Sequence, residues 1–304
     1  MIKGDAVKPT DINGIIIKGV GGAYTVLADG ITYVCNARGV FRNRNITPLV
    51  GDKVLMNVTD KIDDDDEKKR IGTLHTIEPR KNQLLRPPIA NVDQVIITVS
   101  ASSPAFNPGL LDRFLVLVAY ENIPAVICIN KCDDATSLSK NPEFQPYINA
   151  GYPIIFASAM ESTGLDSLRD IMAGKLNVFA GASGVGKSSL INSLSPKLEL
   201  ETGGLSHKLG RGKHTTRHTE IFPLDSGGYC ADTPGFTSLE ISAIPKNELA
   251  SLFKEFLPFI NECRFSNCLH DRESYCAIKE QVGKAIFATR YESYVNLINK
   301  DTRK

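Results

Sequence analysis

The sequence has no long hydrophobic run. Its apolar stretches fall well short of the roughly 20 residues that a membrane-spanning helix needs. The first residues, Met1–Asp5, contain no hydrophobic segment of the kind that secretory signals carry. We therefore expect a cytoplasmic protein with no membrane partner.

An excess of charge of one sign is also absent. The chain has 35 Lys and Arg residues against 34 Asp and Glu residues, which leaves a net charge of +1. No overall field draws such a protein onto nucleic acid, so RNA binding depends on local patches, and we expect no binding to DNA. The 304 residues, 42% of them hydrophobic and 23% charged, suit a soluble globular protein of two or three domains.

The sequence also lacks the cysteine pattern of a small secreted protein held together by disulfides. Its seven cysteines fall into two groups. Four of them lie apart in apolar segments and are expected to be buried as small hydrophobic residues: Cys35, Cys128, Cys132 and Cys230.

The other three cysteines gather near the C-terminus together with a histidine. Cys263, Cys268, His270 and Cys276 form the pattern C-x4-C-x-H-x5-C. Three thiolates and one imidazole complete a tetrahedral shell, which predicts a structural zinc site; the alternative is a set of free surface thiols. Nearby basic residues could meet RNA phosphates, but acidic residues are interspersed almost equally, and an ordinary solvated surface is the favoured interpretation. These basic residues are Arg264, Arg272, Lys279, Lys284 and Arg290.

The N-terminal region, to about Glu78, has the pattern of an all-β domain. Short apolar segments alternate with glycine-rich turns, and Asp29-Gly30 favours a two-residue hairpin turn. Five short strands favour a small barrel of the oligonucleotide-binding (OB) type, although an SH3-like barrel would give a similar pattern. The expected strands are Ile12–Lys18, Ala23–Ala28, Ile31–Asn36, Lys53–Val58 and Gly72–Ile77. The proline-rich stretch Glu78–Pro88 is expected to be a linker.

The central region alternates between strand and helix patterns. Apolar runs typical of buried parallel strands are separated by segments with helical spacing, of which Pro108–Tyr120 is the clearest. The pattern predicts a parallel sheet with helical crossovers. The expected strands are Val95–Val99, Val126–Ile129, Ile154–Ala157 and Leu176–Ala180. After Asp232 the pattern becomes helical and continues through the cysteine cluster.

A phosphate-binding loop follows the last of these strands. The pattern G-x-x-x-x-G-K-[ST] is matched in full by Gly181, Ala182, Ser183, Gly184, Val185, Gly186, Lys187 and Ser188. Ser189–Leu194 continues it as a helix, whose positive end favours phosphate. Lys187 is expected to reach the β- and γ-phosphates, and Ser188 to bind Mg²⁺.

A guanine-reading motif stands before this loop. Asn130, Lys131, Cys132 and Asp133 form N-K-x-D at the end of a strand. A carboxylate at Asp133 can accept hydrogen bonds from guanine N1–H and the 2-amino group, which adenine cannot supply. The Lys131 stem can lie over the base, and Asn130 can brace neighbouring loops. One strand–helix unit later, Ser158 and Ala159 would offer backbone N–H groups to guanine O6.

Two further elements resemble nucleotide switches. Asp232-Thr233-Pro234-Gly235 fits D-x-x-G, in which Asp232 would hold Mg²⁺ and the Gly235 N–H would sense the γ-phosphate. The basic, glycine-rich stretch Gly210–His218 contains Thr215 and Thr216, one of which would complete the Mg²⁺ shell.

The order of these elements is rotated by two positions from the usual order of a small GTPase, so the chain is expected to be circularly permuted. The combination resembles the ribosome-small-subunit-dependent GTPase A (RsgA) family of YjeQ/YloQ type. The matching residues are Asn130–Asp133, Gly181–Ser188, Gly210–Thr216, Asp232–Gly235 and the cysteine cluster.

The resemblance implies three domains: an OB-type barrel (1–80), a permuted GTPase domain (81–240) and a helical zinc domain (241–304). It also implies GTP/GDP, Mg²⁺ and Zn²⁺ as ligands, and GTP hydrolysis stimulated by the small ribosomal subunit during its late assembly. The expected partners are that subunit and its rRNA, and we expect the protein to be a monomer.

The sequence does not identify with certainty which group orients the attacking water. Phe236 follows Gly235, where Ras-like proteins have a water-orienting Gln. His214 is the best local substitute and joins Lys187 and Thr216 as an expected catalytic residue, unless the partner positions the water. Two other functions stay open: an RNA-binding module whose GTP-binding domain has little turnover, and a GTPase switch for a protein partner.

Overall fold

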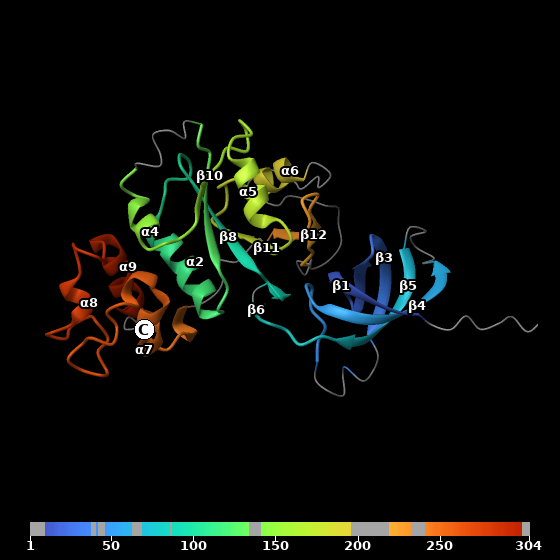
Figure 1. The fold of residues 1–304 in the computed structure, drawn as a ribbon, viewed down its shortest axis with the longest axis horizontal. Helices are drawn as coiled ribbons and strands as arrows, with labels where there is room; N and C mark the ends of the chain where they lie inside the picture. The colour runs from blue at the N-terminus through green and yellow to red at the C-terminus, as the bar shows by residue number, and fades with distance from the viewer. Residues whose placement is uncertain are drawn as a thin grey trace, which may run out of the picture. The chain divides into compact units, whose positions relative to one another are not determined.

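A computed structural model describes residues 10–37, 41, 46–62, 69–85, 87–133, 141–195, 219–232 and 241–299 (Figure 1). These residues pack as two compact units. The first contains the described residues through Val92 together with 219–223 and 229–231, and the second contains the remaining described residues. None of the helices in these ranges is both long and apolar enough to span a membrane.

The N-terminal strands close into a barrel with the order β1-β2-β3-β5-β4. They are β1 (Thr10–Val20), β2 (Ala23–Ala28), β3 (Ile31–Ala37), β4 (Lys53–Ile62) and β5 (Lys69–Ile77). β3 and β5 pair in parallel, whereas β1 with β2, β1 with β4, β2 with β3 and β4 with β5 are antiparallel. Alternate side chains such as Val26, Tyr33 and Cys35 fill the interior. Insertion of β5 between β3 and β4 gives the Greek-key order of the OB type, which confirms the expected barrel.

The stretch expected to be a linker is instead folded against the barrel. It contains a short antiparallel pair, β6 (Gln83–Leu85) and β7 (Pro88–Ala90). Arg80 forms a bidentate ion pair with the fully buried Asp52, at 2.7 Å from Nε to Oδ1 and 2.8 Å from Nη2 to Oδ2. The proline content of this stretch indicates where helices cannot form. It gives no sign that Arg80 forms an ion pair with a carboxylate distant in the sequence.

A second sheet has the strand order β10-β9-β8-β11-β13-β12. Its strands are β8 (Gln94–Ser100), β9 (Ala125–Asn130), β10 (Ile154–Phe156), β11 (Leu176–Ala180), β12 (Phe222–Pro223) and β13 (Tyr229–Asp232). The first four pair with one another in parallel, as β10 with β9, β9 with β8 and β8 with β11, and every residue of β9 and β11 is buried. The continuous apolar runs are therefore explained by burial on both faces, and the expected parallel sheet is confirmed.

Helices cover both faces of this sheet. They are α2 (Pro108–Tyr120), α4 (Gln145–Asn149), α5 (Leu165–Met172) and α6 (Lys187–Leu194). In Figure 1, α2 and α4 lie on one side of the sheet and α5 and α6 on the other. α2 has the expected bounds because the Asn107 side chain accepts from Leu110 N at 3.0 Å and Pro108 opens the first turn. α6 begins at Lys187, two residues before the expected start.

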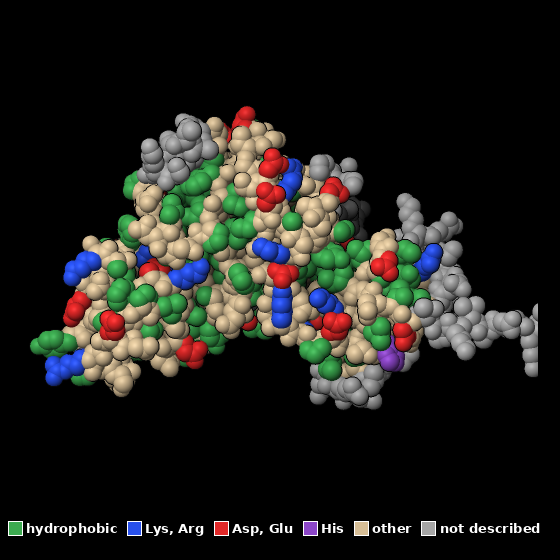
Figure 2. Space-filling model, viewed as in Figure 1, with side chains coloured by type: hydrophobic (Ala, Val, Ile, Leu, Met, Phe, Trp, Pro, Cys, Tyr) green, Lys and Arg blue, Asp and Glu red, His purple; other side chains and the backbone are tan. Residues whose placement is uncertain are grey.

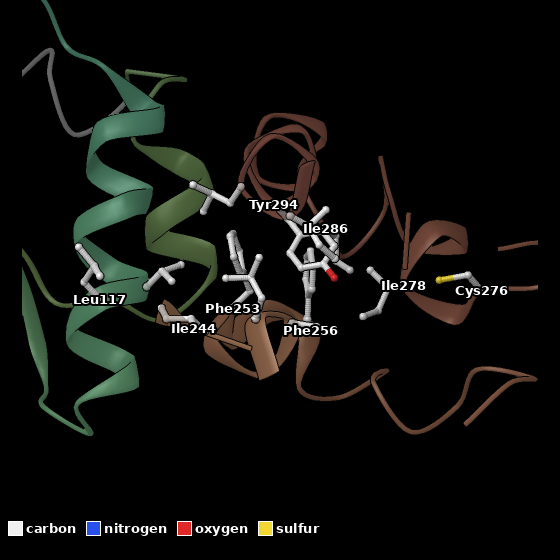
Figure 3. Close-up of a cluster of buried hydrophobic side chains, with 13 residues drawn as sticks. Leu117, Ile244, Phe253, Phe256, Cys276, Ile278, Ile286 and Tyr294 are labelled. Atoms are coloured by element: carbon white, nitrogen blue, oxygen red, sulfur yellow. The ribbon is translucent and has the colours of Figure 1, made fainter. Parts of the chain in front are cut away.

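The C-terminal region consists of short helical turns and one longer helix. Its elements are η2 (Ile241–Ala243), α7 (Lys246–Leu249), η3 (Ala250–Leu252), η4 (Lys254–Phe256), α8 (Ala277–Glu280) and α9 (Ala288–Asn299). They surround an aromatic core in which Tyr294 lies 5.5 Å from Phe253 and 5.1 Å from Phe256 between ring centroids. Val116 and Leu117 of α2 join the same cluster, which runs from α2 to Cys276 (Figure 3). The region therefore shares its core with α2.

Candidate nucleotide site and metal centre

Asn130 connects three of the loops that the sequence marked. It ends β9 and is 1% exposed. Its Nδ2 donates to the Val185 carbonyl at 2.9 Å, in the phosphate loop, and its Oδ1 accepts from Ala159 N at 3.3 Å. One buried amide, which has both a donor and an acceptor, thus joins Asn130–Asp133, the phosphate loop and the Ser158-Ala159 loop.

Lys131 reaches the phosphate loop from the same motif. Its backbone has a left-handed φ of 63°, which turns the chain at the strand end. Its Nζ donates to the Gly184 carbonyl at 2.7 Å and also to the Ser103 carbonyl. Ser103 lies in the loop between β8 and α2, which the sequence analysis did not assign to the site. No local pattern at Ser103 signals this contact, because it uses only the backbone carbonyl.

Asp133 is exposed at the mouth of the site and is oriented by Ser158. The Ser158 hydroxyl donates to Asp133 Oδ1 at 3.2 Å and accepts from Glu161 N at 3.0 Å. The two backbone N–H groups expected to face guanine O6 donate within the protein instead. Ser158 N donates to Thr163 O at 3.0 Å, and Ala159 N has the 3.3 Å bond to Asn130. The serine therefore positions, through its side chain, the carboxylate that the sequence predicts to read the base.

The phosphate loop requires glycine at two close approaches. Gly181 has φ 144°, and a side chain there would collide with the Thr98 carbonyl oxygen. Gly186 has φ 93°, and a side chain there would collide with the amide of Asn130. The loop can therefore curl at the start of α6 only because both residues lack a Cβ atom. The positive end of a helix at this position favours an anion.

Lys187 lies across this loop. Its Nζ donates to the carbonyl oxygens of Gly181 and Ala182, at 3.0 and 2.9 Å. The ammonium is thus held over the concave side of the loop by carbonyl oxygens. A phosphate that enters would offer it a fully charged acceptor in their place.

The other expected nucleotide residues are described only in part. Asp232 is the last residue of β13, which places its backbone at the end of a strand in the same sheet. The predictions for His214, Thr215, Thr216 and Gly235, together with Phe236, lie outside the described residues.

The segment that follows the basic glycine-rich stretch is fixed to the barrel. Ile221 N donates to Ile17 O at 2.9 Å, and the Lys18 ammonium lies 2.5 Å from the Glu220 carboxylate. Ile221 is 1% exposed. The sequence analysis missed this attachment, since the paired residues are about 200 positions apart in the chain.

The four metal-ligand candidates of the C-terminal region converge. Their ligand atoms all lie within 4.8 Å of one another. Cys263 Sγ is 3.8 Å from Cys276 Sγ, and each of these sulfurs is 3.4 Å from His270 Nδ1. Tetrahedral zinc with Zn–S bonds of about 2.3 Å requires sulfur atoms about 3.8 Å apart, so the spacing of this pair fits such an ion. The four side chains could therefore hold a metal ion together, as the sequence predicts.

Surrounding groups hold the loop of this centre in place. Leu269 N and Asp271 N donate to the two oxygens of Glu273, at 2.8 and 3.0 Å. Tyr291 donates from its hydroxyl to the His270 carbonyl at 2.9 Å. Burial lowers the pKa of His270, an effect that Glu273 opposes, and the neutral imidazole is the form that binds metal.

Arg290 lies in the interior and not on the solvated surface that we expected. Its side chain is 2% exposed. The guanidinium contacts Asp112 of α2 and Glu255 of η4, with 2.6 Å from Nε to Glu255 Oε1. It also lies over the rings of Tyr147 and Phe253, at 5.1 and 4.8 Å. Its partners are distant in sequence, so the charge pattern of α9 alone could not reveal them.

The four scattered cysteines are buried, as expected. Burial raises the pKa of Cys35 and of Cys128 to about 12, which keeps these thiols protonated.

Together, the barrel, the parallel sheet and a phosphate loop that follows the N-K-x-D loop define a circularly permuted P-loop GTPase with a C-terminal metal-centre region. Comparisons with known proteins agree. The sequence model of the RsgA GTPase family matches residues 77–242, and that of the RsgA N-terminal domain matches residues 13–63.

Curated relatives and solved structures extend this agreement over nearly the whole chain. The small ribosomal subunit biogenesis GTPase RsgA of Alkaliphilus metalliredigens is 44% identical over 288 residues, covering 94% of this chain and 97% of the relative. The RsgA of Caldanaerobacter subterraneus is 45% identical over 298 residues, covering 96% and 97%. The crystal structure of YjeQ from Thermotoga maritima has a TM-score of 0.81 at 35% identity and covers 97% of this chain and all of that one. That of YloQ, a circularly permuted GTPase, has a TM-score of 0.77 at 38% identity and covers 97% and 96%. The chain belongs to the RsgA GTPase family.

Proposed function

We propose that this protein is a GTPase that binds the small (30S) ribosomal subunit and acts in its late assembly, with hydrolysis stimulated by the subunit. The nucleotide-binding part of this proposal is supported chiefly by the hydrogen bonds of Asn130, because they join three predicted motifs into one site. The ribosomal half is supported by relatives named for small-subunit biogenesis that match almost the whole chain.

Guanine is read chiefly by Asp133 in this proposal. Ser158 holds one carboxylate oxygen of Asp133, so the group is oriented toward the N1–H and 2-amino donors of the base. The Lys131 stem covers one face of the base. Contact with guanine O6 requires Ala159 N to exchange its 3.3 Å bond with Asn130 for one to the ligand.

Phosphate and Mg²⁺ occupy the loop Gly181–Ser188 and the start of α6, which includes Ser189. On binding, Lys187 exchanges the Gly181 and Ala182 carbonyls for the β- and γ-phosphate oxygens. Ser188, Asp232 and either Thr215 or Thr216 hold the Mg²⁺, which neutralises charge on the phosphates when bound. The Gly235 N–H contacts the γ-phosphate.

Hydrolysis by the isolated protein is slow, because Phe236 cannot orient water. In such sites intrinsic turnover is on the order of 10⁻³ s⁻¹. A neutral His214 imidazole orients the attacking water once the subunit has completed the site.

The cysteine–histidine cluster holds a structural Zn²⁺ through Cys263, Cys268, His270 and Cys276, and the ion supplies folding free energy to its region. We place the domains at 1–80, 81–240 and 241–304, with the barrel and the zinc domain contacting rRNA. The protein acts as a monomer in the cytoplasm, where ribosomes are assembled, and has neither a membrane nor a DNA partner.

The test is GTP turnover with and without purified small subunits. We expect low basal turnover and stimulation of at least tenfold by the subunits. Subunit binding without stimulation would indicate an RNA-binding module with a silent nucleotide site. If the protein hydrolyses GTP but neither binds small subunits nor responds to them, it would be a switch for another partner. Either result contradicts the proposal.

A further inference from the structure

Two aromatic side chains of the metal-centre loop lie on the surface instead of in the core. Phe265, two residues after Cys263, is 46% exposed, and Tyr275, directly before Cys276, is 67% exposed. By contrast, Phe253, Phe256 and Tyr294 of the same region are fully buried, as the close-up of that core shows (Figure 3). The core is therefore complete without the two exposed rings.

An arginine joins the two rings into one surface. The Arg264 guanidinium carbon lies 5.8 Å from the centroid of the Phe265 ring and 5.1 Å from that of Tyr275. Arg264 N also donates to the Tyr275 carbonyl at 3.4 Å, so this backbone hydrogen bond connects the two ends of the loop. We call Arg264, Phe265 and Tyr275 the aromatic platform.

The backbone at Tyr275 is unfavourable for a tyrosine. Its φ is 58°, in the left-handed region that a bulky side chain adopts only with strain. Stability alone favours glycine at such a turn. The protein therefore keeps a tyrosine here although its backbone conformation is strained and its ring is exposed. A role of the ring in binding a partner would explain this.

The charges around the platform suit a polyanion. Of the acids in the loop, Glu273 accepts two backbone N–H groups, and Asp271 accepts from Asn299 at 3.2 Å and lies 3.7 Å from the Arg272 guanidinium. Glu262 is the exposed acid of this segment, whereas Arg264 and Arg272 are exposed bases. Charges of both signs are interspersed over the face shown in Figure 2 as a whole. The platform itself carries one exposed base, Arg264, and no acid.

We propose that the aromatic platform stacks against an unpaired base of rRNA in the small subunit, with Arg264 contributing to the contact with the RNA. This inference rests on the proposed function and gives the zinc domain a specific contact. Every base has a π-face, so aromatic rings and a guanidinium can bind an unpaired base without reading its sequence. A protein partner is less favoured because exposed polar residues interrupt the apolar surface: Ser266, Asn267 and Ser274.

The absence of tryptophan from the chain allows a direct test. Tyr275→Trp introduces a single tryptophan at the platform, and stacking on a base quenches its fluorescence. We expect quenching by a short single-stranded oligoriboadenylate and by purified small subunits. Met160→Trp, at a site in another domain that is 85% exposed, is the matched control and should not respond to the oligonucleotide. Phe265→Trp provides a second reporter in case Tyr275→Trp loses its zinc.

A binding measurement separates stacking from a structural role. Phe265→Ala and Tyr275→Gly should each weaken small-subunit binding by about tenfold, the scale expected when one stacked base is lost. Zinc content and GTP affinity should not change. Tyr275→Gly should also not lower thermal stability, because glycine adopts the left-handed backbone without strain.

The outcomes distinguish this inference from the proposed function. If zinc-loaded variants co-sediment with subunits as the wild type does and neither tryptophan reporter is quenched, the platform does not stack on RNA, although the proposed function stands. Quenching by isolated ribosomal proteins but not by RNA would assign the surface to a protein and overturn the inference. If the wild type itself does not co-sediment with small subunits, the proposed function fails and the platform fails with it.

Discussion

At the scale of single residues, Asn130 and Asp133 divide the work of the guanine loop. Asn130 is buried and connects backbone groups, whereas Asp133 is exposed and accepts a hydrogen bond from the Ser158 hydroxyl. A change at Asp133 should therefore alter ligand choice without disturbing the fold.

Asp133→Asn should weaken GTP binding and favour xanthine nucleotides. The amide can donate to the oxygen that xanthine carries at position 2, but it presents a donor to the 2-amino group of guanine. Equilibrium binding of GTP, XTP and ATP measures the effect, and a loss of GTP affinity of at least about a hundredfold is expected when the hydrogen-bonding pair between this side chain and the base is mismatched. If the wild type binds ATP as tightly as GTP, the assignment of Asp133 is wrong.

His214→Ala should lower subunit-stimulated turnover while GTP affinity stays nearly unchanged. An imidazole that only orients water acts in the transition state, so its removal should reduce kcat, by about 10² to 10⁴, and not ground-state binding. Single-turnover hydrolysis with saturating small subunits measures this. Unaltered stimulated turnover in the variant would remove His214 from the catalytic residues and leave the water to the partner.

At the scale of elements, α2 and α9 are joined by a buried charge. Arg290 of α9 meets Asp112 of α2 and Glu255 of η4, while Val116 and Leu117 of α2 join the aromatic core. Burial raises the pKa of the Asp112 carboxyl, and the Arg290 charge opposes this rise. Helix α2, which follows the loop that contains Ser103, is therefore packed against the C-terminal region and ion-paired with it.

Arg290→Met should destabilise the protein by about 3–5 kcal/mol, since it leaves two buried carboxylates without their cation. Urea unfolding monitored by circular dichroism measures the change. Adding Asp112→Asn to Arg290→Met should recover part of the loss, because one of the uncompensated charges is then gone. A single-variant effect below 1 kcal/mol, or a double variant less stable than Arg290→Met, would contradict a net role for this ion pair.

At the scale of the whole molecule, each of the two predicted switch stretches is followed in the chain by a described segment outside the nucleotide motifs. Residues 220–221, just after the basic glycine-rich stretch, pair with β1 of the barrel. The C-terminal elements begin at Ile241, shortly after Asp232–Gly235.

Cys268→Ser should release about one zinc per chain and loosen the region from Glu262 to Asn299, because a structural site needs all four ligands. Small-subunit association should collapse, while GTP affinity holds within a few-fold, since every nucleotide motif precedes the cluster. Cys35→Ser, a buried cysteine in the barrel, is the matched control and should keep its zinc. An equally large fall in GTP affinity would show that the shared core with α2 braces the nucleotide site.

Much of this protein is determined by sequence patterns that act locally. The phosphate loop needs glycine where side chains would strike Thr98 and Asn130, and an eight-residue pattern states this requirement directly. Apolar runs of strand length predicted β8–β11, because a strand buried on both faces must be apolar throughout. The cysteine cluster could be predicted because its four ligands lie within one short stretch.

Only the tertiary structure decided how distant segments meet. The Arg80–Asp52 pair, the attachment of Ile221 to Ile17, the Ser103 carbonyl on Lys131 and the burial of Arg290 all join residues from separate elements. A charged side chain has the same sequence signature on the surface as in the interior, and a backbone carbonyl has none at all. Which of them is buried depends on the partner that the fold brings to it.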